Sequence, residues 1–184
     1  KIVGLGDMLS LSSVPVVASN YDFSNTALAQ RVLPSVIVNA GALKIGFVGL
    51  NIRLLNLVDP TYYEGVVWQD AINVADAEAG KLRQKGADMV IALSHLGYQK
   101  DNDRPYYDRG IAMNTRNIDM IIGGHTHTFL NKAEYVKSLD GDMVPIVQTG
   151  SRGICLGYAK IKLDEQGKPS FDYRLIPVDA SMDK

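Results

Sequence analysis

The chain has 184 residues, of which 46% are hydrophobic and 21% are charged, an ordinary composition for one globular domain with a sizeable core. Its net charge of -1 and its scattered Lys and Arg residues argue against a nucleic-acid polymer as partner. No segment approaches the roughly 20 apolar residues that a membrane-spanning helix needs. The single cysteine, Cys155, excludes an intramolecular disulfide and leaves the cellular compartment open.

The first third of the chain predicts one weak helix followed by strands. Residues 4–12 have weak helical spacing, and residues 14–20 have the pattern of a buried strand that runs into a loop. Residues 35–39 and 43–50 predict two strands around a tight turn. The second of these is almost continuously apolar, which is typical of a strand buried on both faces of a sheet.

The middle of the chain alternates helix and strand. Residues 68–85 predict an amphipathic helix, with Gly86 as its C-terminal cap. Residues 88–93 predict a buried strand, 106–116 a second helix and 119–122 another buried strand. A helix between two such strands favours a parallel arrangement.

The last third of the chain predicts a strand meander. Residues 134–138, 144–149, 154–163 and 170–178 have strand patterns, with hairpin-turn signals between them. The alternating middle and the meander together predict an α/β fold (an α+β layered domain) rather than a parallel-only sheet.

Three histidines follow the two buried strands of the middle region. His95 comes after the first strand, and His125 and His127 come after the second. If the strands are parallel, all three lie at the carboxyl edge of the sheet, where ligands gather in open α/β folds. Neutral imidazole is a common ligand of Zn²⁺, Mn²⁺, Fe²⁺ and Co²⁺. The alternative is three ordinary hydrogen-bonded histidines, because the sequence marks no carboxylate partner for them.

Glycines flank these histidines. Gly123 and Gly124 precede His125, and Gly97 follows His95. Glycine offers backbone freedom and little steric bulk, and we expect both properties to help place the imidazoles.

The histidine segments resemble those of a known family. Residues 94–97 and 118–128 are similar to the later motifs of bacterial 5′-nucleotidases, which are calcineurin-like metallophosphoesterases. Residues 15–23, 43–50 and 147–151 resemble further segments of the same family. The resemblance implies a two-sheet β-sandwich flanked by helices, with two divalent metal ions (Zn, Mn, Co or Fe) at one edge. It implies that His95 and His125 bind one metal and that His127 binds the other.

The family's earlier motifs do not occur in this sequence. It contains no Asp-x-His and no Asn-His pair, and Gly6-Asp7 fits a helix better than the bridging-carboxylate motif. We therefore expect residues 1–184 to form a partial metallophosphoesterase domain, truncated on its N-terminal side and without the C-terminal nucleotide-binding domain. The family's catalytic histidine has no counterpart here, so no catalytic residue is assigned. Weak metal binding and low phosphatase activity are the expected consequences.

The resemblance implies a metal-dependent hydrolase that converts a nucleoside 5′-monophosphate to a nucleoside and phosphate. A related 2′,3′-cyclic phosphodiesterase, a nucleotide-sugar hydrolase and a non-catalytic metal-binding module remain alternatives. A periplasmic or secreted location is implied by the family alone.

Weaker candidates lie outside the histidine motifs. Arg152 stands in a Gly-rich turn and is a candidate phosphate contact, although a solvated turn residue is the simpler interpretation. Asp101 and Asp103 are candidates for orienting a ligand histidine, with a plain surface loop as the alternative. Exposed sheet edges predict a homo-oligomer.

Overall fold

The structure is a computed structural model that describes residues 1–100 and 106–180. Its helices are α1 (Ile2–Ser10), the 3₁₀ helix η1 (Pro60–Tyr62), α2 (Ala71–Gln84) and α3 (Asp108–Asn114). Its strands are β1 (Val16–Val17), β2 (Tyr21–Asp22), β3 (Val32–Leu33), β4 (Ser35–Ala40), β5 (Leu43–Asn51), β6 (Val67–Trp68), β7 (Met89–His95), β8 (Met120–Ile122), β9 (Glu134–Lys137), β10 (Met143–Val147), β11 (Cys155–Leu163) and β12 (Pro169–Pro177).

A six-stranded mixed sheet in the order β4-β5-β7-β8-β10-β9 forms the centre of the fold. The four inner strands β5, β7, β8 and β10 are parallel, and the two edge strands are antiparallel to their neighbours. The parallel pairing of β7 with β8 confirms the arrangement that the helix between them predicted. The antiparallel edges confirm a mixed sheet.

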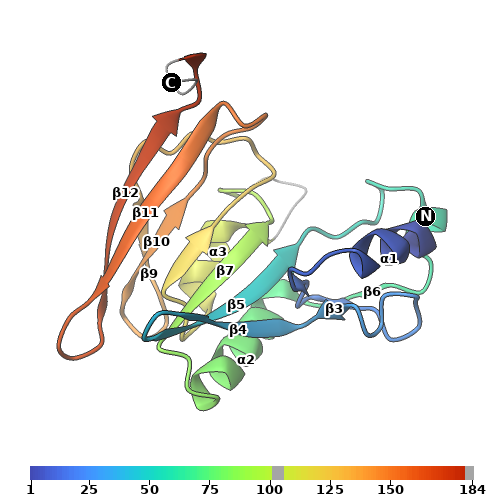
Figure 1. The fold of residues 1–184 in the computed structure, drawn as a ribbon, viewed down its shortest axis with the longest axis horizontal. Helices are drawn as coiled ribbons and strands as arrows, with labels where there is room; N and C mark the ends of the chain where they lie inside the picture. Colours follow the sequence, from blue (N-terminus) through green and yellow to red (C-terminus); the bar gives the residue numbers. More distant parts are fainter. Residues whose placement is uncertain (101–105, 181–184) are drawn as a thin grey trace.

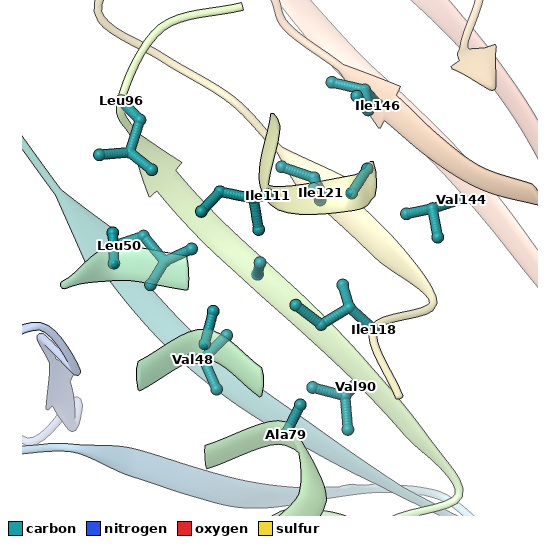
Figure 2. Close-up of a cluster of buried hydrophobic side chains, with 14 of the residues drawn as sticks. Val48, Leu50, Ala79, Val90, Leu96, Ile111, Ile118, Ile121, Val144 and Ile146 are labelled. Atoms are coloured by element: carbon teal, nitrogen blue, oxygen red, sulfur yellow. The ribbon is translucent and has the colours of Figure 1, made fainter. Parts of the chain in front are cut away.

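Helices α2 and α3 cover one face of this sheet. Alternate residues of the inner strands point toward them, and α2 buries a stripe that contains Ala75, Ala79 and Leu82. Figure 2 shows Val48 and Val90 of the sheet in the same cluster as Ala79. Small alanines on α2 let the helix approach the sheet closely.

The hairpin β11–β12 covers part of the opposite face. Its inward residues Ile161 and Phe171 pack against Met89 and Met120 of the central sheet. Figure 1 places this ribbon on one side of the molecule and α1 on the other. The layered α/β class is thereby confirmed. Among the described residues, the β11–β12 hairpin is the second sheet of the predicted sandwich, packed on the six-stranded sheet.

The structure corrects two expected boundaries, those of a helix and a strand, and confirms that Gly6-Asp7 is helical. Helix α2 begins at Ala71 rather than 68, because the side chain of Asp70 accepts a hydrogen bond from the amide of Asn73 and caps the helix there. The strand expected over residues 14–20 is reduced to Val16–Val17. Gly6-Asp7 lies inside α1, as its sequence context indicated.

No helix in the described ranges is long and apolar enough to cross a membrane.

Candidate metal centre

Two of the three predicted histidines come together at the carboxyl edge of the sheet. His95 is the last residue of β7, and His125 lies in the loop that follows β8. Their ring centroids are 5.1 Å apart, with an angle of 68° between the ring planes. Because β7 and β8 are parallel neighbours, two residues thirty positions apart in sequence meet at one point.

His127 lies on the same loop and is exposed to solvent. Within residues 1–100 and 106–180, no three His, Cys, Asp or Glu side chains are close enough together to hold one metal ion. The described chain therefore offers a pair of imidazoles and a separate third one.

The loop that carries His125 and His127 has an unusual backbone. His125 has a φ of 72° and His127 a φ of 55°, both in the left-handed region that L-residues with a Cβ seldom adopt. Conformations of this kind persist only where surrounding contacts impose them, and they are concentrated at functional sites. Gly97 after His95 also has a positive φ of 97°, so the expected role of its backbone freedom is confirmed.

A buried glutamine imposes the conformation of this loop. Gln148 is the residue after the end of β10, and its side chain is buried, with 1% exposure, against the histidine loop. Its Oε1 accepts hydrogen bonds from the amide of Thr128 at 2.5 Å and from the Thr126 hydroxyl at 3.3 Å. Its Nε2 donates to the carbonyl oxygen of Gly124 at 3.0 Å. In the sequence, Gln148 stood out only as part of a family-like segment, because no local pattern marks a side chain that bonds to a distant loop.

Gly123 and Gly124 act through their lack of bulk and not through backbone freedom, because neither has a positive φ. A Cβ on Gly124 would lie 3.0 Å from Nδ1 of His95 and 3.2 Å from the carbonyl oxygen of Ser94. A Cβ on Gly123 would collide with Oδ2 of Asp108. Gly124 therefore allows the His125 loop to pack onto the end of β7, and Gly123 allows it to pack against Asp108.

Asp108 is a buried carboxyl group behind the histidine pair. It is the first residue of α3, has 0% exposure, and accepts a 2.5 Å hydrogen bond from the hydroxyl of Ser94 through Oδ1. Burial raises the pKa of this carboxyl to about 7, against the lowering effect of the Ser94 hydrogen bond. Asp108 was missed at the level of sequence, where it looks like an ordinary helix-starting aspartate.

The neighbouring strand end is also fixed by a buried polar side chain. Asn51, the last residue of β5, is in register with His95. The buried Asn20 side chain donates to the carbonyl oxygen of Asn51 and accepts from its amide, both at 2.8 Å. Asn20 thus anchors the end of β5 beside the site.

Of the weaker candidate residues, the structure describes Arg152 alone. Arg152 is exposed in a turn where Gly150, Arg152 and Gly153 all have positive φ. This turn begins beside the histidine loop, since the amide of Gly150 donates to the carbonyl oxygen of Thr128 at 3.0 Å. Asp101 and Asp103 lie outside the described residues.

The chemistry of the pair fits a borderline divalent cation. Neutral imidazoles are suitable nitrogen donors for Zn²⁺, Mn²⁺, Fe²⁺ or Co²⁺, and His95 is exposed to solvent. The two rings meet edge to face, and the missing side chain of Gly124 leaves room for the His95 ring. Two nitrogen donors would hold part of the coordination shell of such an ion and would leave further positions for other ligands.

The sequence of this chain is similar to part of the sequences of several 5′-nucleotidases. The chain is 29% identical over 184 residues to the snake venom 5′-nucleotidase of Gloydius brevicauda, an alignment that covers 90% of this chain and 30% of the venom protein. It is 29% identical over 176 residues to the mouse 5′-nucleotidase, covering 86% of this chain and 29% of that protein. The chain is homologous to part of the 5′-nucleotidases.

The fold agrees with this homology. The solved structure of a 5′-nucleotidase precursor from Thermus thermophilus superposes with a TM-score of 0.77 at 24% identity, over 94% of this chain and 35% of that one. At this identity the likeness establishes the fold alone. No family model matches the chain. The 5′-nucleotidase relatives named above are about three times as long as the matched segment, since the chain spans about 30% of their length.

Proposed function

We propose that this chain contributes the His95–His125 pair and His127 to a dinuclear metal centre that hydrolyses nucleoside 5′-monophosphates to nucleoside and phosphate. The single observation that carries the proposal is the meeting of His95 and His125 at the carboxyl edge of parallel strands, with ring centroids 5.1 Å apart. Homology to 5′-nucleotidases supports the choice of substrate class.

Each residue has a distinct part in this proposal. His95 and His125 hold one divalent ion, and His127 holds a second. Arg152 binds a phosphate oxygen from the turn beside the histidine loop. Bound metal ions of this kind polarise a phosphoryl oxygen and make a hydroxide nucleophile available near neutral pH. A calcineurin-like site, with Zn, Mn, Co or Fe as its metals, is the form of centre that we infer.

The described residues supply no carboxylate that bridges the histidines, so two adjacent cations would repel each other with little negative charge between them. We therefore infer that this chain by itself binds metal weakly and hydrolyses AMP slowly. Export from the cytoplasm belongs to the same proposal and is supported by the venom and precursor proteins among the relatives.

The experiment is a Co²⁺ titration of the purified 184-residue chain, followed by the visible absorption of the bound metal. We expect binding that His95→Ala and His125→Ala each weaken at least about tenfold, because each removes one of few ligands. His127→Ala should leave the first binding event intact and weaken a second one. Lys162→Ala, on the exposed face of the β11–β12 ribbon, is the matched control and should bind as the unchanged chain does.

Phosphate release from AMP, 2′,3′-cyclic AMP and a nucleoside-diphosphate sugar then tests the substrate. Slow release that is fastest with AMP and is lost in His125→Ala supports the proposal. Preference for either other substrate overturns the 5′-monophosphate assignment. Cobalt binding without any turnover supports a non-catalytic metal-binding module instead, and the absence of cobalt binding overturns the metal centre.

A further inference from the structure

Asp108 has no obvious reason to be buried. Its Oδ2 atom is inaccessible to solvent and has no hydrogen-bond partner within the described ranges. Burying a carboxyl group without satisfying both oxygens costs stability, so such a residue in a folded protein calls for a specific explanation. A small apolar side chain at this position would avoid that cost.

The contacts of Asp108 join the two segments that carry the histidine pair. Through Oδ1 it accepts the hydrogen bond from Ser94, the residue directly before His95. Its own amide donates to the carbonyl oxygen of Gly97, two residues after His95, at 2.7 Å. Oδ2 occupies the space that a Cβ on Gly123 would need, two residues before His125. One side chain therefore contacts both the end of β7 and the start of the His125 loop.

We propose that Asp108 is a positioning residue that sets the distance and angle between the imidazoles of His95 and His125. Its carboxyl group acts as a spacer: Ser94 fixes one side, and the backbone at Gly123 rests against the other. The hydroxyl of Ser94 also accepts a 3.2 Å hydrogen bond from the amide of Leu96, so the turn around His95 is held by the same pair of side chains. The role in a metal centre rests on the function proposed above, but the geometric role does not.

The test measures the nuclear Overhauser effect between ring protons of His95 and His125 in the metal-free chain. Only three histidines are present, so their resonances can be assigned with single substitutions. We expect a cross peak in the unchanged chain, because the ring centroids are 5.1 Å apart. Asp108→Ala and Ser94→Ala should abolish it, whereas Asp108→Asn, which keeps the volume and the Oδ1 acceptor, should retain it.

Asp119→Asn is the matched control for a general loss of stability. Asp119 is also a mostly buried aspartate, but it lies before β8 at the opposite end of that strand, where it accepts from the amide of Val90 and pairs with Arg83. We expect Asp119→Asn to lower the unfolding temperature while the cross peak persists. If Asp108→Ala does not fold, Ser94→Ala carries the same test, since it removes only one hydroxyl group.

A cross peak of unchanged intensity in a folded Asp108→Ala or Ser94→Ala chain overturns the positioning role, as does its absence from the unchanged chain. Cobalt affinity supplies a second measurement, and we expect Asp108→Ala to lower it about tenfold, as is usual when a residue behind a metal ligand is lost. If the cross peaks behave as expected but the unchanged chain binds no Co²⁺, the proposed metal centre fails and the positioning role stands.

Discussion

The side-chain amide of Gln148 donates a 3.0 Å hydrogen bond to the carbonyl oxygen of Gly124, the residue directly before His125. The same side chain accepts from the amide of Thr128, the residue directly after His127. One buried side chain thus closes the histidine loop from both ends. This closure explains how His125 and His127 are held at positive φ without glycine at either position.

Gln148→Leu should therefore destabilise the fold and loosen the histidine loop. The change leaves the amide of Thr128 without its partner and removes one of the two hydrogen bonds that the carbonyl of Gly124 accepts, the other coming from the amide of Thr126. We expect the free energy of unfolding to fall by about 1–3 kcal/mol. Urea denaturation measures this loss. Gln69→Leu, at an exposed position, is the control and should stay within about 0.5 kcal/mol of the unchanged chain. An unchanged urea midpoint for Gln148→Leu would show that the closure contributes nothing.

Gly124→Ala should displace the His95 ring. The added Cβ would lie 3.0 Å from its Nδ1, so the imidazole or the loop must move by a few tenths of an ångström. We expect a stability loss of about 1–3 kcal/mol, typical of overpacking, and a weaker cross peak between His95 and His125. Gly80→Ala is the contrasting change, because a Cβ there meets nothing within 4 Å and the position lies inside α2. It should stabilise the chain by about 0.5–1 kcal/mol.

Asp108 should make the stability of the chain depend on pH. Its pKa is raised from 3.8 to about 7 in the folded chain, so between these values the folded state binds a proton that the unfolded state has lost. The stabilisation from this proton is complete below pH 3.8 and disappears as the pH rises through 7. The full effect is about 4 kcal/mol as an order of magnitude.

The measurement is the free energy of unfolding at pH 5 and pH 8 for the unchanged chain and Asp108→Asn. We expect Asp108→Asn to reduce the loss of stability between these two pH values. Asp172→Asn, at an exposed position of β12, serves as the control and should keep the original difference. Equal differences for all three chains would rule out Asp108 as the titrating group.

Strand β4 should promote self-association, the oligomeric state expected from the sequence. It lies at one edge of the six-stranded sheet, and its Val38 is 42% exposed. Open edges with apolar side chains pair readily with a second copy. We expect light scattering at high protein concentration to detect a dimer that Val38→Lys converts to monomer. Leu139→Lys, which is exposed but lies outside the strands, should leave the dimer intact. A monomeric mass for the unchanged chain would refute the prediction.

Several features of the fold could be predicted because their causes are local. The apolar runs that became β5 and β7 are continuous in sequence, and strands buried on both faces need such runs. The start of α2 was misplaced by three residues because Trp68 continues the apolar pattern, whereas the capping contact of Asp70 depends on side-chain geometry. The strand expected over residues 14–20 is shortened to Val16–Val17, because only these two residues pair with the neighbouring strand Val32–Leu33.

The sequence by itself determined that His95 and His125 stand at the carboxyl ends of two strands, because strand pattern and position along the chain are local properties. Only the tertiary structure decided how these rings meet. Their contact depends on the parallel register of β7 and β8, on Asp108 between the two segments, and on the hydrogen bonds of Gln148 to the loop. Such contacts join residues far apart in the chain, and no periodicity or spacing records them.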